Sequence, residues 1–151
     1  IAGLNMLASM RLCANVPSQF GIQTALGGYQ SIYDLTLPTG RLMRQRDVAW
    51  QLLTEIPGVT CYKPKAALYL FPRLDSEIYP IKNDQEFVLD LLLEEKVLLV
   101  QGSGFNWKNH DHFRVVFLPN VDDLTEAIGR IAHYLQRYRK RHHTDQKHSV
   151  A

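Results

Sequence analysis

Residues 97–118 read VLLVQGSGFNWKNHDHFRVVFL and decide the fold class. Val97–Val100 is apolar on both faces and too short for a helix, which predicts a central strand covered on each side. Residues 112–118 alternate between two faces, which predicts a second strand after a Gly-Ser-Gly turn. One face of that strand carries only apolar side chains: Phe113, Val115 and Phe117.

Two further strands and a helix are predicted upstream of this stretch. Val59–Tyr62 and Ala67–Phe71 are rich in β-forming residues and are separated by a turn at Lys63-Pro64-Lys65, so we expect them to pair as a hairpin. Asn83 with Glu86 matches a capping box, and the apolar positions that follow predict a helix ending near residue 96.

Helices are predicted at both ends of the chain. Residues 4–36 have helical spacing and break near Asn15-Val16-Pro17, and a third helix is expected between residues 41 and 56. The last helix is amphipathic and is expected to begin at a capping box of Asp123 and Glu126. The basic segment after residue 141 offers no apolar face, which predicts a disordered tail.

The predicted element order is helices followed by β-β-α-β-β-α. This order indicates an α/β fold with helices packed on a small open sheet, which is either a separate sandwich or the smaller lobe of a larger enzyme. We divide the chain into residues 1–36 as connecting helices, residues 37–141 as a small domain and residues 142–151 as the tail.

Composition excludes several classes of protein. The chain has 151 residues, 46% of them hydrophobic and 21% charged, which is ordinary for a folded domain and unlike a disordered chain. The net charge of +2 gives no reason to expect nucleic acid or a membrane surface as a partner. Two cysteines far apart suggest a reducing cytoplasm, and a start at Ile1 without a basic leader suggests part of a longer protein.

Arg114 is the most informative single residue. It lies within the apolar run 113–117, where an unpaired guanidinium would be costly to bury. The planar guanidinium binds a carboxylate through two parallel hydrogen bonds. Two partners therefore remain open, an internal Asp or Glu or the carboxylate of a ligand.

Other motifs are weaker. The loop at 102–107 follows a strand, but Trp107 stands where a dinucleotide-binding loop needs its third glycine, so the loop is either a simple turn or the lining of a ligand cleft. His110 and His112 could present two imidazoles, but no third ligand is evident and we expect no metal site. Lys63 and Lys65 are expected to be solvated, and no hydrolase motif is present.

The sequence resembles the C-terminal part of a fold-type I pyridoxal-phosphate aminotransferase of class I/II, and within that family the bacterial glutamate-pyruvate (alanine) enzymes. The resemblance rests on LNMLASMRLCANVP at 4–17, QTALGG at 23–28, the Arg-x-x-Arg-x-Arg-Asp run at 41–47, AALYLFP at 66–72, and the stretch from Val97 to Gly102 continuing to Phe105-Asn106-Trp107 and His112-Phe113-Arg114.

This resemblance implies that Arg114 binds the α-carboxylate of amino and 2-oxo acid substrates, and that Gly104, Phe105 and Asn106 line the cleft. It also implies pyridoxal 5'-phosphate as the cofactor of a full-length homodimer that transfers the amino group of alanine to 2-oxoglutarate. The family's Schiff-base lysine and cofactor-binding residues match no position in this chain, so the chain alone is expected to be inactive. The alternative is an independent regulatory or RNA-binding α/β module.

Overall fold

The computed structural model describes residues 1–10 and 15–148, and for residues 143–148 it describes only the helical backbone. The elements along the chain are α1 (Ala2–Met10), α2 (Val16–Gly27), α3 (Ser31–Thr36), α4 (Arg41–Thr54), β1 (Val59–Thr60), β2 (Tyr69–Leu70), β3 (Arg73–Leu74), α5 (Asp84–Glu95), β4 (Val100–Gln101), the 3-10 helix η1 (Gly102–Phe105), β5 (Phe113–Val116) and α6 (Val121–His148). The predicted α/β class with helices before the sheet is confirmed.

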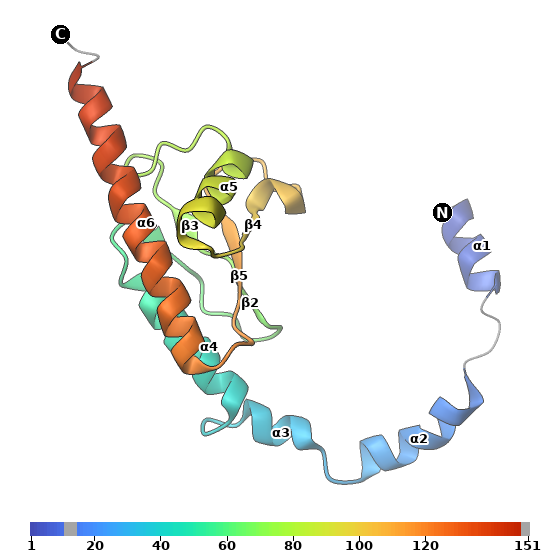
Figure 1. Ribbon diagram of the computed structural model, residues 1–151. Helices are drawn as coiled ribbons and strands as arrows, with labels where there is room; N and C mark the ends of the chain where they lie inside the picture. The colour runs from blue at the N-terminus through green and yellow to red at the C-terminus, as the bar shows by residue number, and fades with distance from the viewer. Residues whose placement is uncertain (11–14, 149–151) are drawn as a thin grey trace.

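The chain divides into two parts of different character (Figure 1). Helices α1, α2 and α3 extend away from the rest of the molecule, and we call them the N-terminal arm; the part from α4 through α6 is the lobe. The predicted break near residue 15 is confirmed, because the Asn15 side chain caps α2 by accepting a hydrogen bond from the Ser18 amide at 3.4 Å. None of the described residues in the three arm helices is buried.

The sheet pairing differs from the predicted hairpin. Strand β1 pairs with β3, whereas β2 pairs with β5, and both pairs are antiparallel. The segment Val59–Tyr62 therefore does not pair with Ala67–Phe71, and the sequence pattern missed β3, which is only two residues long. A turn signal alone cannot fix the partner of so short a strand, because pairing also depends on which residues the rest of the lobe buries.

The prediction of a central strand at Val97–Val100 is wrong. In the three-stranded sheet the order is β2-β5-β4, so β5 is central and β4 lies at an edge. Only Val100 and Gln101 pair with β5, and the Leu98 side chain is 77% exposed. A short apolar run need not be covered on both faces, since single exposed apolar side chains are common on protein surfaces.

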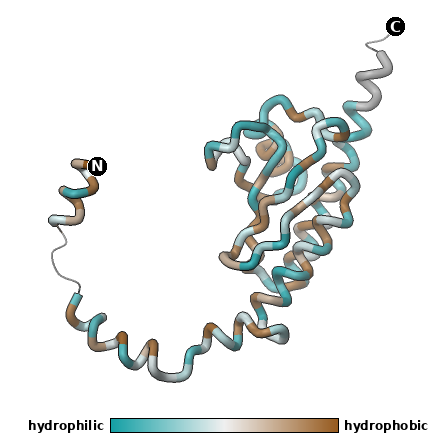
Figure 2. Tube along the Cα trace, turned by 180° about the vertical axis from the view of Figure 1, so that it is seen from behind, coloured by the Kyte–Doolittle hydropathy of each residue, from teal (hydrophilic) through white to brown (hydrophobic). Residues whose placement is uncertain are grey.

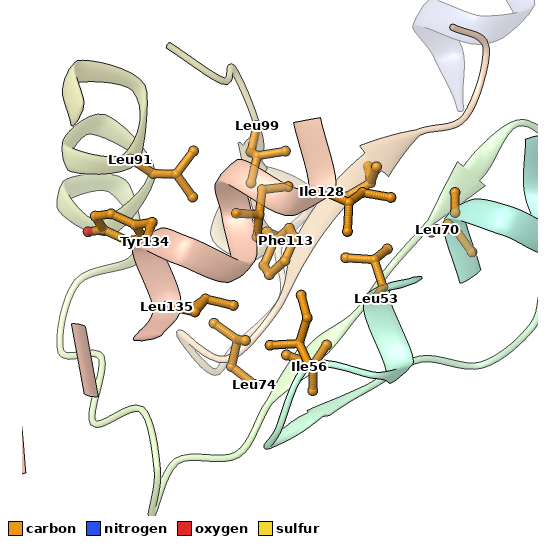
Figure 3. Packing of buried hydrophobic residues seen from close by; sticks show 14 of the residues in the cluster. Leu53, Ile56, Leu70, Leu74, Leu91, Leu99, Phe113, Ile128, Tyr134 and Leu135 are labelled. Carbon is orange, nitrogen blue, oxygen red and sulfur yellow. The ribbon is translucent and has the colours of Figure 1, made fainter. Parts of the chain in front are cut away.

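The core lies between one face of the sheets and helices α4, α5 and α6 (Figure 3). Leu53 of α4, Phe113 of β5 and Leu135 of α6 each have at most 1% of their surface exposed. Val115 and Phe117 lie on the same face as Phe113 and are also buried, which confirms the predicted core face of this strand. Among the described residues, none of the α-helices packs over the other face of the β2-β5-β4 sheet.

The helix ends agree with the sequence in part. Asn83 caps α5 as predicted, because its Oδ1 accepts hydrogen bonds from the amides of Gln85 and Glu86. Helix α6 begins one turn earlier than predicted, because Asn120 caps it by accepting from the Asp123 amide at 2.9 Å. The hydrogen bonds between Asn120 and Asp123 thus replace the predicted capping box of Asp123 and Glu126.

The predicted disordered tail begins within a helix. Helix α6 continues to His148, and the ring of His142 lies 4.3 Å from the ring of Tyr138. The ring contact lies within α6, whereas the Arg141 ion pair with Glu94 of α5 holds the helix to the lobe up to the predicted boundary at residue 141. The remaining residues 149–151 lie outside the described part of the chain. No helix in the described residues combines the length and apolar character that crossing a membrane requires.

Candidate functional site: an unpaired arginine on the open face of the sheet

The open face of the three-stranded sheet carries polar and aromatic side chains. Side chains alternate along a strand, so the residues next to buried Leu70 and Phe113 point to the opposite face. The register places β2 and β5 side by side and continues as a bridge between Arg73 and His112. The residues brought together on this face are Tyr69, Phe71, Arg73, His112 and Arg114.

Arg114 is held between two aromatic rings. Its Cζ lies 4.7 Å from the ring centre of Tyr69 and 4.5 Å from that of Phe105, which are cation–π distances. Its Nε is buried and has no hydrogen-bond partner among the residues that the structure describes. Among the described residues the structure pairs Arg114 with no carboxylate, so the internal salt bridge that the sequence left open is absent there.

This arrangement fits an anion. A buried guanidinium N–H without an acceptor costs free energy. A hydrogen bond to a charged acceptor recovers the largest part of that cost. The two rings fix the plane of the guanidinium, because rotation away from either ring would lose a cation–π contact. The site therefore presents an oriented cation whose donors suit the two oxygens of a carboxylate.

The loop that begins with η1 covers the arginine. Gly102 permits the loop to approach β5 closely, since a Cβ at this position would lie 2.9 Å from the carbonyl oxygen of His112. Phe105 contacts Arg114, and its place in a substrate cleft remains a prediction. Gly104 and Asn106 lie exposed on the same loop, and their place in a cleft remains a prediction.

The Asp111 carboxylate binds several side chains of the open face. Asp111 accepts hydrogen bonds from Trp107 Nε1 at 3.0 Å and Arg73 Nε at 3.2 Å, and its Oδ1 lies 2.7 Å from His112 Nδ1. Burial opposes ionisation of Asp111, but these hydrogen bonds outweigh it and lower its pKa. The ring of His112 stacks on Phe71 at 4.8 Å. Asp111 therefore fixes several side chains of the open face in one arrangement.

The two histidines considered as metal ligands are directed to different carboxylates. His110 Nδ1 lies 3.1 Å from Asp84 Oδ1, whereas His112 Nδ1 faces Asp111. In the described part of the chain, no three His, Cys, Asp or Glu side chains gather as metal ligands.

The lysines do not adjoin the arginine. Lys63 Nζ lies 3.1 Å from Asp47 Oδ1 and 4.9 Å above the Trp50 ring. Neither of the two cavities that adjoin Arg114 and its aromatic neighbours is lined by a lysine in the described residues. We assign none of the residues of this site to hold a cofactor.

Sequence reasoning missed two parts of this site. Tyr69 was read only as part of a strand, although its spacing from Phe71 and Arg73 would have placed all three on one face. Asp84 was not singled out, because nothing in its neighbourhood along the chain indicates that its carboxylate contacts a loop about twenty residues away.

The chain is similar to known proteins over most of its length. The family model "Aminotransferase class I and II" matches residues 7–131. Glutamate-pyruvate aminotransferase AlaA of Haemophilus influenzae is 59% identical over 140 residues, which cover 93% of this chain and 35% of that protein. Alanine aminotransferase of Mycobacterium tuberculosis is also 59% identical over 140 residues, covering 93% of this chain and 33% of that protein.

A solved structure gives the same result. The crystal structure of an aminotransferase from Escherichia coli matches with a TM-score of 0.79 and 58% identity, covering 89% of this chain and 33% of that one. The chain thus spans about a third of the length of the relatives it matches. The alternative of an independent regulatory or RNA-binding module is not supported. The match to the family model and the similarity to these relatives identify the chain as part of a member of the class I and II aminotransferase family.

Proposed function

We propose that this chain supplies the substrate α-carboxylate site of a pyridoxal-phosphate-dependent aminotransferase, and that Arg114 is the residue that binds the carboxylate. The observation that carries the proposal is the buried, partnerless Nε of Arg114 between the rings of Tyr69 and Phe105. The cofactor, when bound, supplies the electron sink for the chemistry at the substrate carbon.

The residues of this chain act on the substrate rather than on the cofactor. The Arg114 guanidinium donates two parallel hydrogen bonds to the carboxylate and so fixes the direction of the bond to the reacting carbon. Tyr69 and Phe105 keep the guanidinium oriented, so that its donors are already placed for the carboxylate.

We propose alanine with 2-oxoglutarate as the substrate pair, forming pyruvate and glutamate. Two relatives with 59% identity carry the names glutamate-pyruvate aminotransferase and alanine aminotransferase, which supports this choice. Every one of these substrates has the α-carboxylate that Arg114 would bind. We propose further that the complete enzyme is a cytoplasmic homodimer, and light scattering of the purified enzyme measures its subunit number.

The proposal is tested by replacing Arg114 in the complete enzyme. Arg114→Ala removes two charge-assisted hydrogen bonds worth about 1.5–3 kcal/mol each, so we expect kcat/KM for L-alanine to fall by roughly a hundredfold or more. Arg114→Lys should restore only part of the loss, because an ammonium lacks the planar pair of donors.

A substrate without the carboxylate separates binding from folding. In Arg114→Ala, the fall in kcat/KM should be much smaller for ethylamine, because ethylamine has no carboxylate for Arg114 to bind. Arg130→Ala is the matched control, because Arg130 pairs with Glu126 on the surface of α6 and should leave both rates unchanged. If the ratio of the two kcat/KM values is the same in wild type and Arg114→Ala, Arg114 does not bind the substrate.

A further inference from the structure

Asp84 is a buried carboxylate to which the site described above assigns no role. It is the first residue of α5, and its side chain is 3% exposed. A carboxylate at the start of a helix is favoured by the helix dipole and is usually solvated, so burial at this position needs further partners.

Its partners lie on the loop that covers Arg114. Asp84 Oδ2 accepts a hydrogen bond from the Ser103 amide at 2.8 Å, and Oδ1 accepts from the Ser103 hydroxyl at 2.9 Å. Oδ1 also lies 3.1 Å from Nδ1 of His110. Burial opposes ionisation of Asp84, but these hydrogen bonds outweigh it and lower its pKa, which keeps the carboxylate charged near neutral pH.

Ser103 and His110 stand on either side of the residue that contacts the arginine. Phe105 lies between them in the sequence, and its ring is 4.5 Å from Arg114 Cζ. Phe105 is 44% exposed, and its ring meets only the edge-on ring of Phe71 at 6.2 Å besides the guanidinium among the ring contacts of the described residues, so the ring is only partly packed. The position of the ring therefore depends on how firmly the two flanks of the loop are fixed.

We infer that Asp84 is a positioning residue, whose carboxylate joins both flanks of the 103–110 loop to α5 and thereby keeps Phe105 over Arg114. The effect on substrates rests on the proposed function, but the effect on the loop does not. Helix α5 is a suitable anchor because Phe87 and Leu91 bury it in the core of the lobe.

The effect of Asp84 on the loop is tested first, in the absence of substrate. The amides of Asn106 and Trp107 donate to the carbonyl oxygens of Ser103 and Gly102 at 3.1 and 3.2 Å. In Asp84→Asn we expect hydrogen exchange of these two amides to be roughly tenfold faster, with the amides of α4 unchanged. Asp122→Asn is the matched control, since Asp122 is an exposed carboxylate in the first turn of α6.

Kinetics of the complete enzyme test the consequence. Asp84→Asn should raise KM for L-alanine several-fold more than it lowers kcat, and should leave ethylamine turnover nearly unchanged. In a Phe105→Ala background the same substitution should have no further effect on alanine, because the ring it positions is gone. Ser103→Ala, which removes one hydrogen bond and keeps the amide, should reproduce part of the change.

The outcomes separate this inference from the proposed function. Unchanged exchange of the Asn106 and Trp107 amides in Asp84→Asn overturns the positioning role, whatever the kinetics. An effect of Asp84→Asn on alanine that persists at full size in Phe105→Ala also overturns it. If instead Arg114→Ala has no effect on substrate selectivity while the loop amides respond to Asp84→Asn, the proposed function fails and the positioning of the loop stands.

Discussion

The N-terminal arm and the lobe are both rich in apolar residues, but only the lobe buries them. Leu7 in α1 and Leu26 in α2 are 64% and 71% exposed, whereas Leu53 in α4 is fully buried. Figure 2 shows apolar residues recurring along the described helices of the arm, and no other described part of the chain lies beside α1 and α2. The comparison teaches that helical spacing and a good cap are enough to specify where a helix lies, but burial of its apolar face requires a partner.

The largest expected effect compares one leucine from each region. Leu53→Ala should lower the free energy of unfolding of this chain by about 2–5 kcal/mol, because it leaves a cavity in the core. Leu7→Ala should change it by no more than about 0.5 kcal/mol, because the side chain loses no buried contacts. Urea unfolding followed by circular dichroism measures both. Equal losses would mean that the arm shares the core of the lobe.

A smaller effect concerns the ion pairs that join α5 to α6 within the lobe. Hydrogen bonds from Arg141 and Arg137 lower the pKa of Glu94 to about 2 from an ordinary value of 4.5. A depressed pKa adds stability above pH 4.5 that disappears as the pH falls from there towards 2. Glu94→Gln should therefore cost about 1 kcal/mol at pH 7 and progressively less below pH 4.5, since the pairs are partly exposed.

The control for this prediction is Glu77→Gln, which removes an exposed carboxylate outside the helices. Urea unfolding between pH 7 and pH 3 gives the free-energy difference for each variant. A difference between wild type and Glu94→Gln that stays constant over this range would contradict the assigned ion pairs.

The smallest expected effect is a gain in stability. Ala67 has φ of 62°, a left-handed conformation that disfavours any side chain. Ala67→Gly should raise the free energy of unfolding by about 0.5 kcal/mol, because relief of this strain exceeds the entropy that glycine adds to the unfolded chain. Ala66→Gly, at a neighbour without a positive φ, should lower it. A loss of stability in both variants would show that Ala67 is unstrained.

Helices were predictable from local signals, and strand partners were not. Asn15 and Asn83 are caps that act on amides two or three residues away, so the sequence contains the whole interaction. The partner of β1 is instead β3, whose two residues carry no pattern long enough to detect. The edge position of β4 also depends on the order of the strands in the folded sheet, and an apolar run does not reveal that order.

The candidate site was predictable in its central residue only. Arg114 stands out because a charge within an apolar strand requires an anion. The two rings beside Arg114 come from separate elements, Tyr69 from β2 and Phe105 from η1. Asp84 contacts its partners from the first residue of α5. Such long-range contacts exist only after folding, which is why the geometry, and not the pattern, connects these residues.

The most direct test of the central claim is a crystal structure of the complete enzyme with a bound amino or 2-oxo acid. The account predicts two guanidinium nitrogens of Arg114 about 2.7–2.9 Å from the two oxygens of the α-carboxylate, with Tyr69 and Phe105 still against the guanidinium. A carboxylate bound elsewhere, with Arg114 paired to an Asp or Glu of the enzyme, would contradict it.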